Sequence, residues 1–194
     1  MDTYSAPWGW CRRCISQAQL DLNNQLRTLW EQHVFWTRLF INSAVFNLPD
    51  IDYVTERLLR NPLDFQAQLE PLYGPQIAAG FATLLTEHLT IAAELVQAAI
   101  MGDAAAVADA ERRWYQNADQ IAALLAHINP FWSEQEWRRM LHEHLALTQQ
   151  EAVVLIAHNY AASIALLDRI EAQALEMADM LTEGILKQFP REFR

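Results

Sequence analysis

Apolar residues recur at steps of three and four along most of this chain. That spacing places side chains on one face of an α-helix. It predicts five long helices, over residues 16–47, 74–101, 104–128, 134–157 and 160–188. No stretch shows the alternation of apolar and polar residues that is typical of a β-strand. The pattern therefore indicates an all-α protein.

The residues between these stretches are typical of helix ends. Gly102 and Asp103 form a turn with an N-cap, and Ser133 with Glu136 forms a capping box before the next helix. Between the first two long helices, prolines interrupt the chain at positions 49, 62, 71 and 75. We expect two short crossover helices there, over residues 51–60 and 63–70, with Asn61 placed to cap the second.

Two of the long helices contain the same motif, and a third contains it more faintly. The sequence LWEQHV at positions 29–34 is followed, at nearly equal spacings, by LTEHL at 85–89 and LHEHL at 141–145. The helices that follow the last two copies also match, at a slightly longer spacing, as in Pro130 and Pro190. This duplicated helical hairpin predicts an up-and-down bundle of five long helices plus the two short crossover helices, with the first helix alongside the duplicated four.

Composition narrows the class of protein. With 194 residues, 52% of them hydrophobic, the chain is long enough for one core, and we expect a single domain over residues 16–194. The net charge of −10 argues against nucleic acid or an anionic membrane as a partner, because binding phosphates needs clustered Lys and Arg. We find no secretory signal, membrane segment or nucleotide-binding loop, and expect a cytoplasmic protein without a nucleotide cofactor.

The N-terminal arm, residues 1–15, contains the only two cysteines, Cys11 and Cys14. A redox motif with this spacing belongs in a βαβ unit, and a closed zinc site needs four ligands, so one pair meets neither requirement alone. Two reduced thiols in a mobile arm are the simplest interpretation. A redox role, or a metal shared between subunits, is the alternative.

Each copy of the repeated motif places one histidine in the apolar stripe of its helix: His33, His88 and His144. Folding the chain back at residues 102–103 sets His88 opposite Asn117. Pro130 corresponds to Pro190 in the repeat and, at the same spacing, Asn117 corresponds to Met177. We therefore expect His144 to face the region of Met177. We expect the three histidines to form one buried layer across the bundle.

Three glutamates, Glu111, Glu151 and Glu171, are expected about one to two helical turns from this layer. Buried imidazoles and carboxylates must be paired, hydrated or bound to metal, because leaving them unpaired is costly. On facing helices they hold iron, manganese or zinc. We therefore expect a metal-binding protein with these six residues as candidate ligands. The Glu-x-x-His motif of di-iron bundles is absent, and a buried polar layer that fixes helix register is the alternative.

Two other classes of function stay open. One is a non-catalytic module that assembles as a homo-oligomer through an apolar helix face. The other is a small-molecule binder whose pocket is lined by Trp36, Trp114 and the histidines. The arginine pairs at 112–113 and 138–139 are typical of solvated faces, with anion binding as the alternative. No motif identifies a reaction, so whether the protein is an enzyme stays open.

Six short segments resemble a known family: residues 29–38 (LWEQHVFWTR), 57–62 (RLLRNP), 114–119 (WYQNAD), 177–179 (MAD), 184–185 (GI) and 188–190 (QFP). They are similar to a family of uncharacterised bacterial helical proteins, often given the automatic label acetylglutamate kinase. An amino-acid kinase needs an α/β sheet with glycine-rich loops, whereas this chain has five glycines and no strand pattern. Residues 33–36 and the crossover are also similar to ferritin-like bundles, which implies a metal in the core, although that family's glutamate-histidine pairs do not map here.

Overall fold

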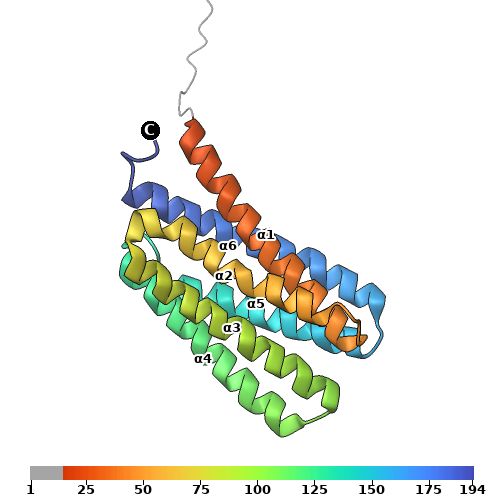
Figure 1. Ribbon diagram of the computed structural model, residues 1–194. Helices are drawn as coiled ribbons and strands as arrows, with labels where there is room; N and C mark the ends of the chain where they lie inside the picture. Colours follow the sequence, from red (N-terminus) through yellow and green to blue (C-terminus); the bar gives the residue numbers. More distant parts are fainter. Residues whose placement is uncertain (1–14) are drawn as a thin grey trace, which may run out of the picture.

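The computed structural model describes residues 15–194, which form six α-helices with short connections (Figure 1). The helices are α1 (Gln17–Val45), α2 (Ile51–Tyr73), α3 (Pro75–Met101), α4 (Ala104–Ile128), α5 (Glu134–Ile156) and α6 (Tyr160–Gln188). No strand occurs between residues 15 and 194, and the all-α prediction is confirmed. Cys11 and Cys14, with nearly all of the predicted N-terminal arm, lie outside the described residues.

Side-chain caps begin α1, α4 and α5, and those at Asp103 and Ser133 were predicted. The Ser16 hydroxyl accepts a hydrogen bond from the backbone N–H of Gln19, whose own side chain accepts one from the N–H of Ser16. The Asp103 carboxylate accepts from two N–H groups in the first turn of α4, and the Ser133 hydroxyl accepts from the first turn of α5. Gly102 closes α3 with φ of 70°, in the left-handed region that favours glycine.

The segment between α1 and α3 is one continuous helix, α2, so the prediction of two short crossover helices is wrong. Pro62 and Pro71 lie inside α2. Pro62 lacks the N–H that would bond to the carbonyl of Leu58, and such a loss normally ends or bends a helix. Here Phe65 and Leu69, just beyond the proline, are fully buried. Their packing stabilises the helix across the interruption, and Asn61 becomes a buried mid-helix residue rather than a cap.

The six helices form a closed ring. Each packs against its neighbours in the chain, and α1 also packs against α6. In Figure 1 the turns of the hairpins α1/α2, α3/α4 and α5/α6 lie at one end of the bundle, and the start of α1 and the end of α6 lie at the other. Helices α1, α3 and α5 contact one another as well, so these three helices supply the middle of the bundle.

Helix α3 is the most apolar of the six. By length and composition alone it is long and apolar enough to cross a membrane, a test that core helices of water-soluble proteins also pass. In this structure it lies between α2 and α4, with Phe81, Leu85 and Leu95 buried in the core.

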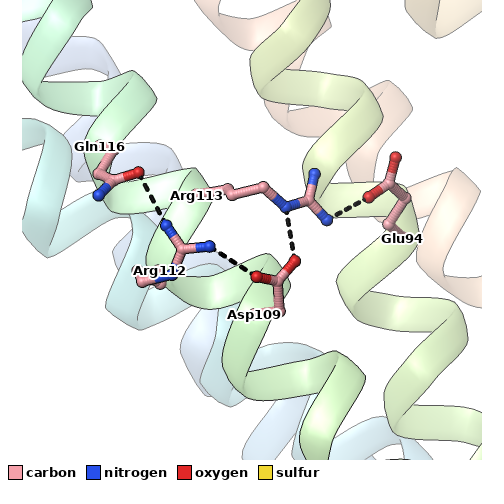
Figure 2. Close-up of polar contacts among 5 residues, drawn as sticks. All are labelled: Glu94, Asp109, Arg112, Arg113 and Gln116. Atoms are coloured by element: carbon pink, nitrogen blue, oxygen red, sulfur yellow. Dashed lines mark hydrogen bonds and ion pairs between the residues drawn. The ribbon is translucent and has the colours of Figure 1, made fainter.

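A chain of surface contacts joins α3 to α4 (Figure 2). Arg113 on α4 donates to Glu94 on α3 at 2.5 Å and to Asp109 at 2.8 Å. Arg112 donates to the other oxygen of Asp109 at 2.6 Å and to Gln116 at 3.1 Å. Both arginines therefore have carboxylate partners from their own chain, which leaves them poorly suited to bind an external anion.

Candidate functional site

Three buried histidines lie on the three inner helices. His33 on α1, His88 on α3 and His144 on α5 are each 3% exposed. The ring centroids of His33 and His144 are 5.6 Å apart. His88 stacks at a tilt against Trp114, with centroids 5.3 Å apart, and lies close enough to His33 for their charges to interact. The repeated motif thus brings one imidazole from each hairpin into one part of the core.

Each imidazole contacts a side-chain amide on the second helix of its own hairpin. The Nδ1 atoms of His33, His88 and His144 lie 3.2, 2.9 and 3.0 Å from the amide oxygens of Asn61, Asn117 and Gln173 respectively. The predicted pairing of His88 with Asn117 is confirmed. The predicted partner region of His144 is wrong by one turn, because Gln173 rather than Met177 faces it.

The amides are themselves held by backbone. Their NH₂ groups donate to the carbonyl of the residue four positions before each histidine: Leu29, Leu84 and Met140, at 3.0, 3.0 and 2.9 Å. A backbone carbonyl only accepts, so each amide must turn its NH₂ to the carbonyl and its oxygen to the imidazole. An amide oxygen also only accepts, so the imidazole proton must sit on Nδ1. In all three neutral rings Nε2 is then an unprotonated acceptor.

Burial keeps these rings neutral. It lowers the pKa of His33 from 6.5 to about 4, with the Asn61 hydrogen bond opposing the shift. Burial first, and repulsion from His33 second, lower the pKa of His88 to about 3. The pKa of His144 falls to about 3, because burial and the charges of both other histidines act together. At neutral pH the layer is therefore three neutral imidazoles.

A small cavity adjoins all three rings. Its volume is about 10 Å³, and its lining consists of the three histidines, Trp30, Trp137 and the apolar side chains of Phe81, Leu85, Ile121, Leu125, Leu141 and Leu181. One water molecule needs about 10–15 Å³, whereas organic ligands occupy pockets of about 300 Å³ or more. The cavity thus has room for a single small species. Trp36 lies elsewhere, under the guanidinium of Arg57 at 5.0 Å.

Two of the residues that line the cavity have indole N–H groups without an acceptor among residues 15–194. They are Trp30, 5% exposed, and Trp137, fully buried. Trp30 makes edge contacts with His33 at 5.6 Å and with His144 at 6.4 Å. Trp132, by contrast, donates its indole N–H to the carbonyl of Met180 at 3.1 Å. The lining residues therefore include three imidazoles and two indoles, although the surface of the cavity itself is almost wholly apolar.

The three glutamates predicted as ligands lie apart from this cavity. Glu151 is 2% exposed and forms an ion pair with Arg38; burial raises its pKa, and Arg38 opposes the shift. Glu171 is exposed on α6, where a hydrogen bond with Glu31 raises its pKa. Glu111 is half-buried on α4, near Tyr115. None of them lines the cavity beside the histidines.

As the side chains stand, no three His, Cys, Asp or Glu residues of the described chain are placed to hold one metal ion together. Two of the amide partners, Asn61 and Gln173, are the part of the site that sequence reasoning missed. A signal for them was present, because Asn61, Asn117 and Gln173 are equally spaced along the chain, as the histidines nearly are. The repeat spacing between α4 and α6 stays unchanged as far as Gln173 and becomes longer only after that residue. Helix α6 has 29 residues, whereas α4 has 25.

Comparisons with models of protein families, with curated proteins and with solved structures give no match to this chain. The site must therefore be interpreted from its own chemistry.

Proposed function

We propose that the protein binds one transition-metal ion through Nε2 of His33, His88 and His144. The observation that supports this most strongly is the relay from imidazole to amide to backbone carbonyl, repeated in all three hairpins. Metal-binding histidines in general donate the other ring N–H to an oxygen acceptor, which fixes the tautomer and the ring orientation. No hydrogen bond from a described residue occupies the three Nε2 atoms, so each has a lone pair available to bind a metal.

The distance between His33 and His144 suits this proposal. Two imidazoles that share a zinc ion, at Zn–N distances of about 2.0–2.1 Å, have ring centroids roughly 5 Å apart. The centroids of His33 and His144 are 5.6 Å apart. Uptake of the ion requires the rings to move inward, above all His88, while each Nδ1–H keeps its amide acceptor. Changes of side-chain rotamer on this scale are common when a protein binds its partner.

Ligand chemistry narrows the choice among iron, manganese and zinc. Imidazole suits zinc and iron, whereas manganese favours carboxylate and carbonyl oxygens. The cavity wall has three imidazoles and no carboxylate. We therefore propose zinc or iron. The ion would lie in the core between facing helices, as in ferritin-like bundles, but with histidines in place of the glutamate-histidine pairs.

The test is a titration of metal-free protein with zinc against a chromophoric chelator. We expect one zinc ion per chain. Replacing any one of the three histidines by glutamine should weaken zinc binding by more than about 100-fold, since even the partners behind metal ligands contribute 10- to 100-fold. His127→Gln is the matched control, because His127 is exposed in the last turn of α4.

Circular dichroism must show that each variant keeps its helices. Zinc binding that survives the replacement of all three histidines, or that falls equally with His127→Gln, would contradict the proposal.

A further inference from the structure

A hollow on the surface lies between α1 and α6, apart from the histidine layer. Its volume is about 130 Å³, close to the roughly 150 Å³ of an engineered cavity that binds benzene. Most of its surface is apolar. The hollow therefore has room for an apolar group of about one aromatic ring. Its lining residues are Glu31, Val34, Phe35, Arg38, Leu167, Glu171 and Ala174.

Two carboxyl groups from different helices meet at this hollow. Glu31 on α1 and Glu171 on α6 are both exposed, so we place their carboxyl groups at its rim rather than on its floor. A hydrogen bond with Glu31 is the first cause that raises the pKa of Glu171, and burial and the charges of Glu31 and Asp168 add to it. Helix packing thus holds like charges together, which is unfavourable unless a proton or a cation lies between them.

The protein itself supplies no partner for this pair within the described residues. Neither Glu31 nor Glu171 forms an ion pair with a Lys, Arg or His between residues 15 and 194. Arg38, which lines the hollow, is paired with Glu151. The rim therefore carries negative charge that suits a cation from outside the chain.

The side chain of Phe35 is also available to such a ligand. It is 55% exposed although it borders the apolar hollow, so contact with an apolar group would remove more of it from water. A second hollow of about 470 Å³ continues along α1 and shares Glu31 and Phe35 with the first. A ligand can therefore approach the carboxyl pair and the apolar hollow from the surface. The other residues of the second hollow are Asn24, Arg27, Thr28, Gln32 and Leu175.

We propose that the hollow between α1 and α6 binds a small organic ammonium ion. The ammonium group lies between the carboxylates of Glu31 and Glu171, and an apolar body of about one aromatic ring fills the hollow beside Phe35. An inorganic cation would leave the apolar surface in water, and a neutral molecule would leave the carboxylates without a cation. The inference does not depend on the metal site, because the hollow shares no lining residue with the cavity at the histidines.

Benzylammonium is the probe for this site, and two-dimensional NMR of nitrogen-15-labelled protein at pH 7 follows its binding. We expect saturable shifts of the amide signals of residues 31–38 and 167–174, with a Kd on the order of 1 mM for so small a ligand. Benzyl alcohol has the same ring without the charge, and it should bind about tenfold more weakly. Methylammonium has the charge without the ring, and it should also bind about tenfold more weakly.

Glu31→Gln together with Glu171→Gln should weaken benzylammonium binding about tenfold, because two partly screened ion pairs are lost. The matched control is Glu56→Gln together with Glu176→Gln, which removes the same charge from exposed positions outside both hollows. Its affinity should equal that of wild type. Equal losses in the two double variants would overturn the inference, since they would show only a general attraction to an acidic protein. Benzyl alcohol that binds as tightly as benzylammonium would also overturn it, as would wild-type protein that shows no saturable shift at about 10 mM.

Discussion

Two regions of the core bury polar side chains, and they differ in how completely those groups satisfy one another. Between α1, α5 and α6, Arg38 donates from one guanidinium nitrogen to both Glu151 and Ser163. Opposite charges are paired there. In the histidine layer each Nδ1 contacts its amide, whereas no hydrogen bond from a described residue occupies Nε2.

This difference separates a structural role from a binding role. A buried pair such as Arg38 and Glu151 offsets its own desolvation, and its function is complete once the helices are packed. In the histidine layer each ring has a partner at Nδ1 and no hydrogen bond from the described residues at Nε2, and this arrangement is the same in all three hairpins. A ring nitrogen left unoccupied in three corresponding places is what we expect of a site that binds a ligand.

The largest predicted effect is the pH dependence of the metal-free protein. Because the folded-state pKa values of the three histidines, about 4, 3 and 3, lie below the unfolded value of 6.5, the unfolded chain binds more protons between those limits. The free energy of unfolding should be fully present above pH 6.5. It should fall below that pH by up to about 1.4 kcal/mol per unit for each histidine, or roughly 4 kcal/mol per unit for three.

Urea unfolding at pH 7, 6 and 5 measures this slope. Replacing His88 and His144 together by glutamine should reduce the slope to about a third of the wild-type value. Parallel slopes in wild type and double variant would show that these histidines are not buried as neutral rings.

The second effect concerns the ion pair. Arg38→Met leaves the Glu151 carboxylate buried without its cation, and we expect a loss of about 3–5 kcal/mol in the free energy of unfolding. The double variant Arg38→Met with Glu151→Leu should recover most of that loss, because it removes both charges. Denaturant unfolding of both variants tests this. A double variant no more stable than the single one would show that the pair is needed for more than mutual neutralisation.

A smaller effect is expected from Asn117→Leu. This change leaves the Nδ1–H of His88 without an acceptor and removes the second hydrogen bond to the carbonyl of Leu84, which keeps its bond within α3; we expect a cost of about 1–3 kcal/mol in the free energy of unfolding. It should also weaken zinc binding 10- to 100-fold, since the amide holds the ligand ring. The control is Gln116→Leu, one residue earlier and exposed. If both variants lose the same zinc affinity, the amide does not position His88.

The smallest effect should come from the surface network of Figure 2. Arg113→Ala removes contacts to Glu94 and Asp109, but water and salt screen exposed pairs of this kind. We expect no resolvable change in Tm at 0.15 M salt. A clear drop in Tm that persists in 1 M salt would contradict this expectation. It would mean that these contacts fix the register of α3 against α4, and that surface contacts stabilise the fold as buried ones do.

Most helix ends could be predicted from the sequence because they depend on local chemistry. Ser16, Asp103 and Ser133 act as caps through hydrogen bonds to N–H groups within three residues of each. The continuity of α2 could not be predicted in this way. Local rules end a helix at Pro62, whereas the burial of Phe65 and Leu69 depends on neighbours far along the chain.

The histidines of the candidate site could be predicted from the sequence, but most of their amide partners could not. The histidines stand out because they repeat within a short motif. Their amide partners lie 28 or 29 residues downstream with no motif around them. The longer spacing taken from Pro130 and Pro190, which follow α4 and α6, moved the expected partner of His144 by one turn. The ion pair of Glu151 could not be predicted from the sequence either, because its partner Arg38 lies 113 residues away along the chain.

The most direct measurement is of the ring nitrogens themselves. Nitrogen-15 NMR of the histidine side chains reports which nitrogen carries the proton in each neutral ring. For metal-free protein at pH 7 we predict that His33, His88 and His144 all have the proton on Nδ1, and that their signals stay unchanged down to pH 5. Adding one equivalent of zinc should shift all three Nε2 signals. Protons on Nε2, or rings that become charged above pH 5, would contradict the arrangement from which the metal site is inferred.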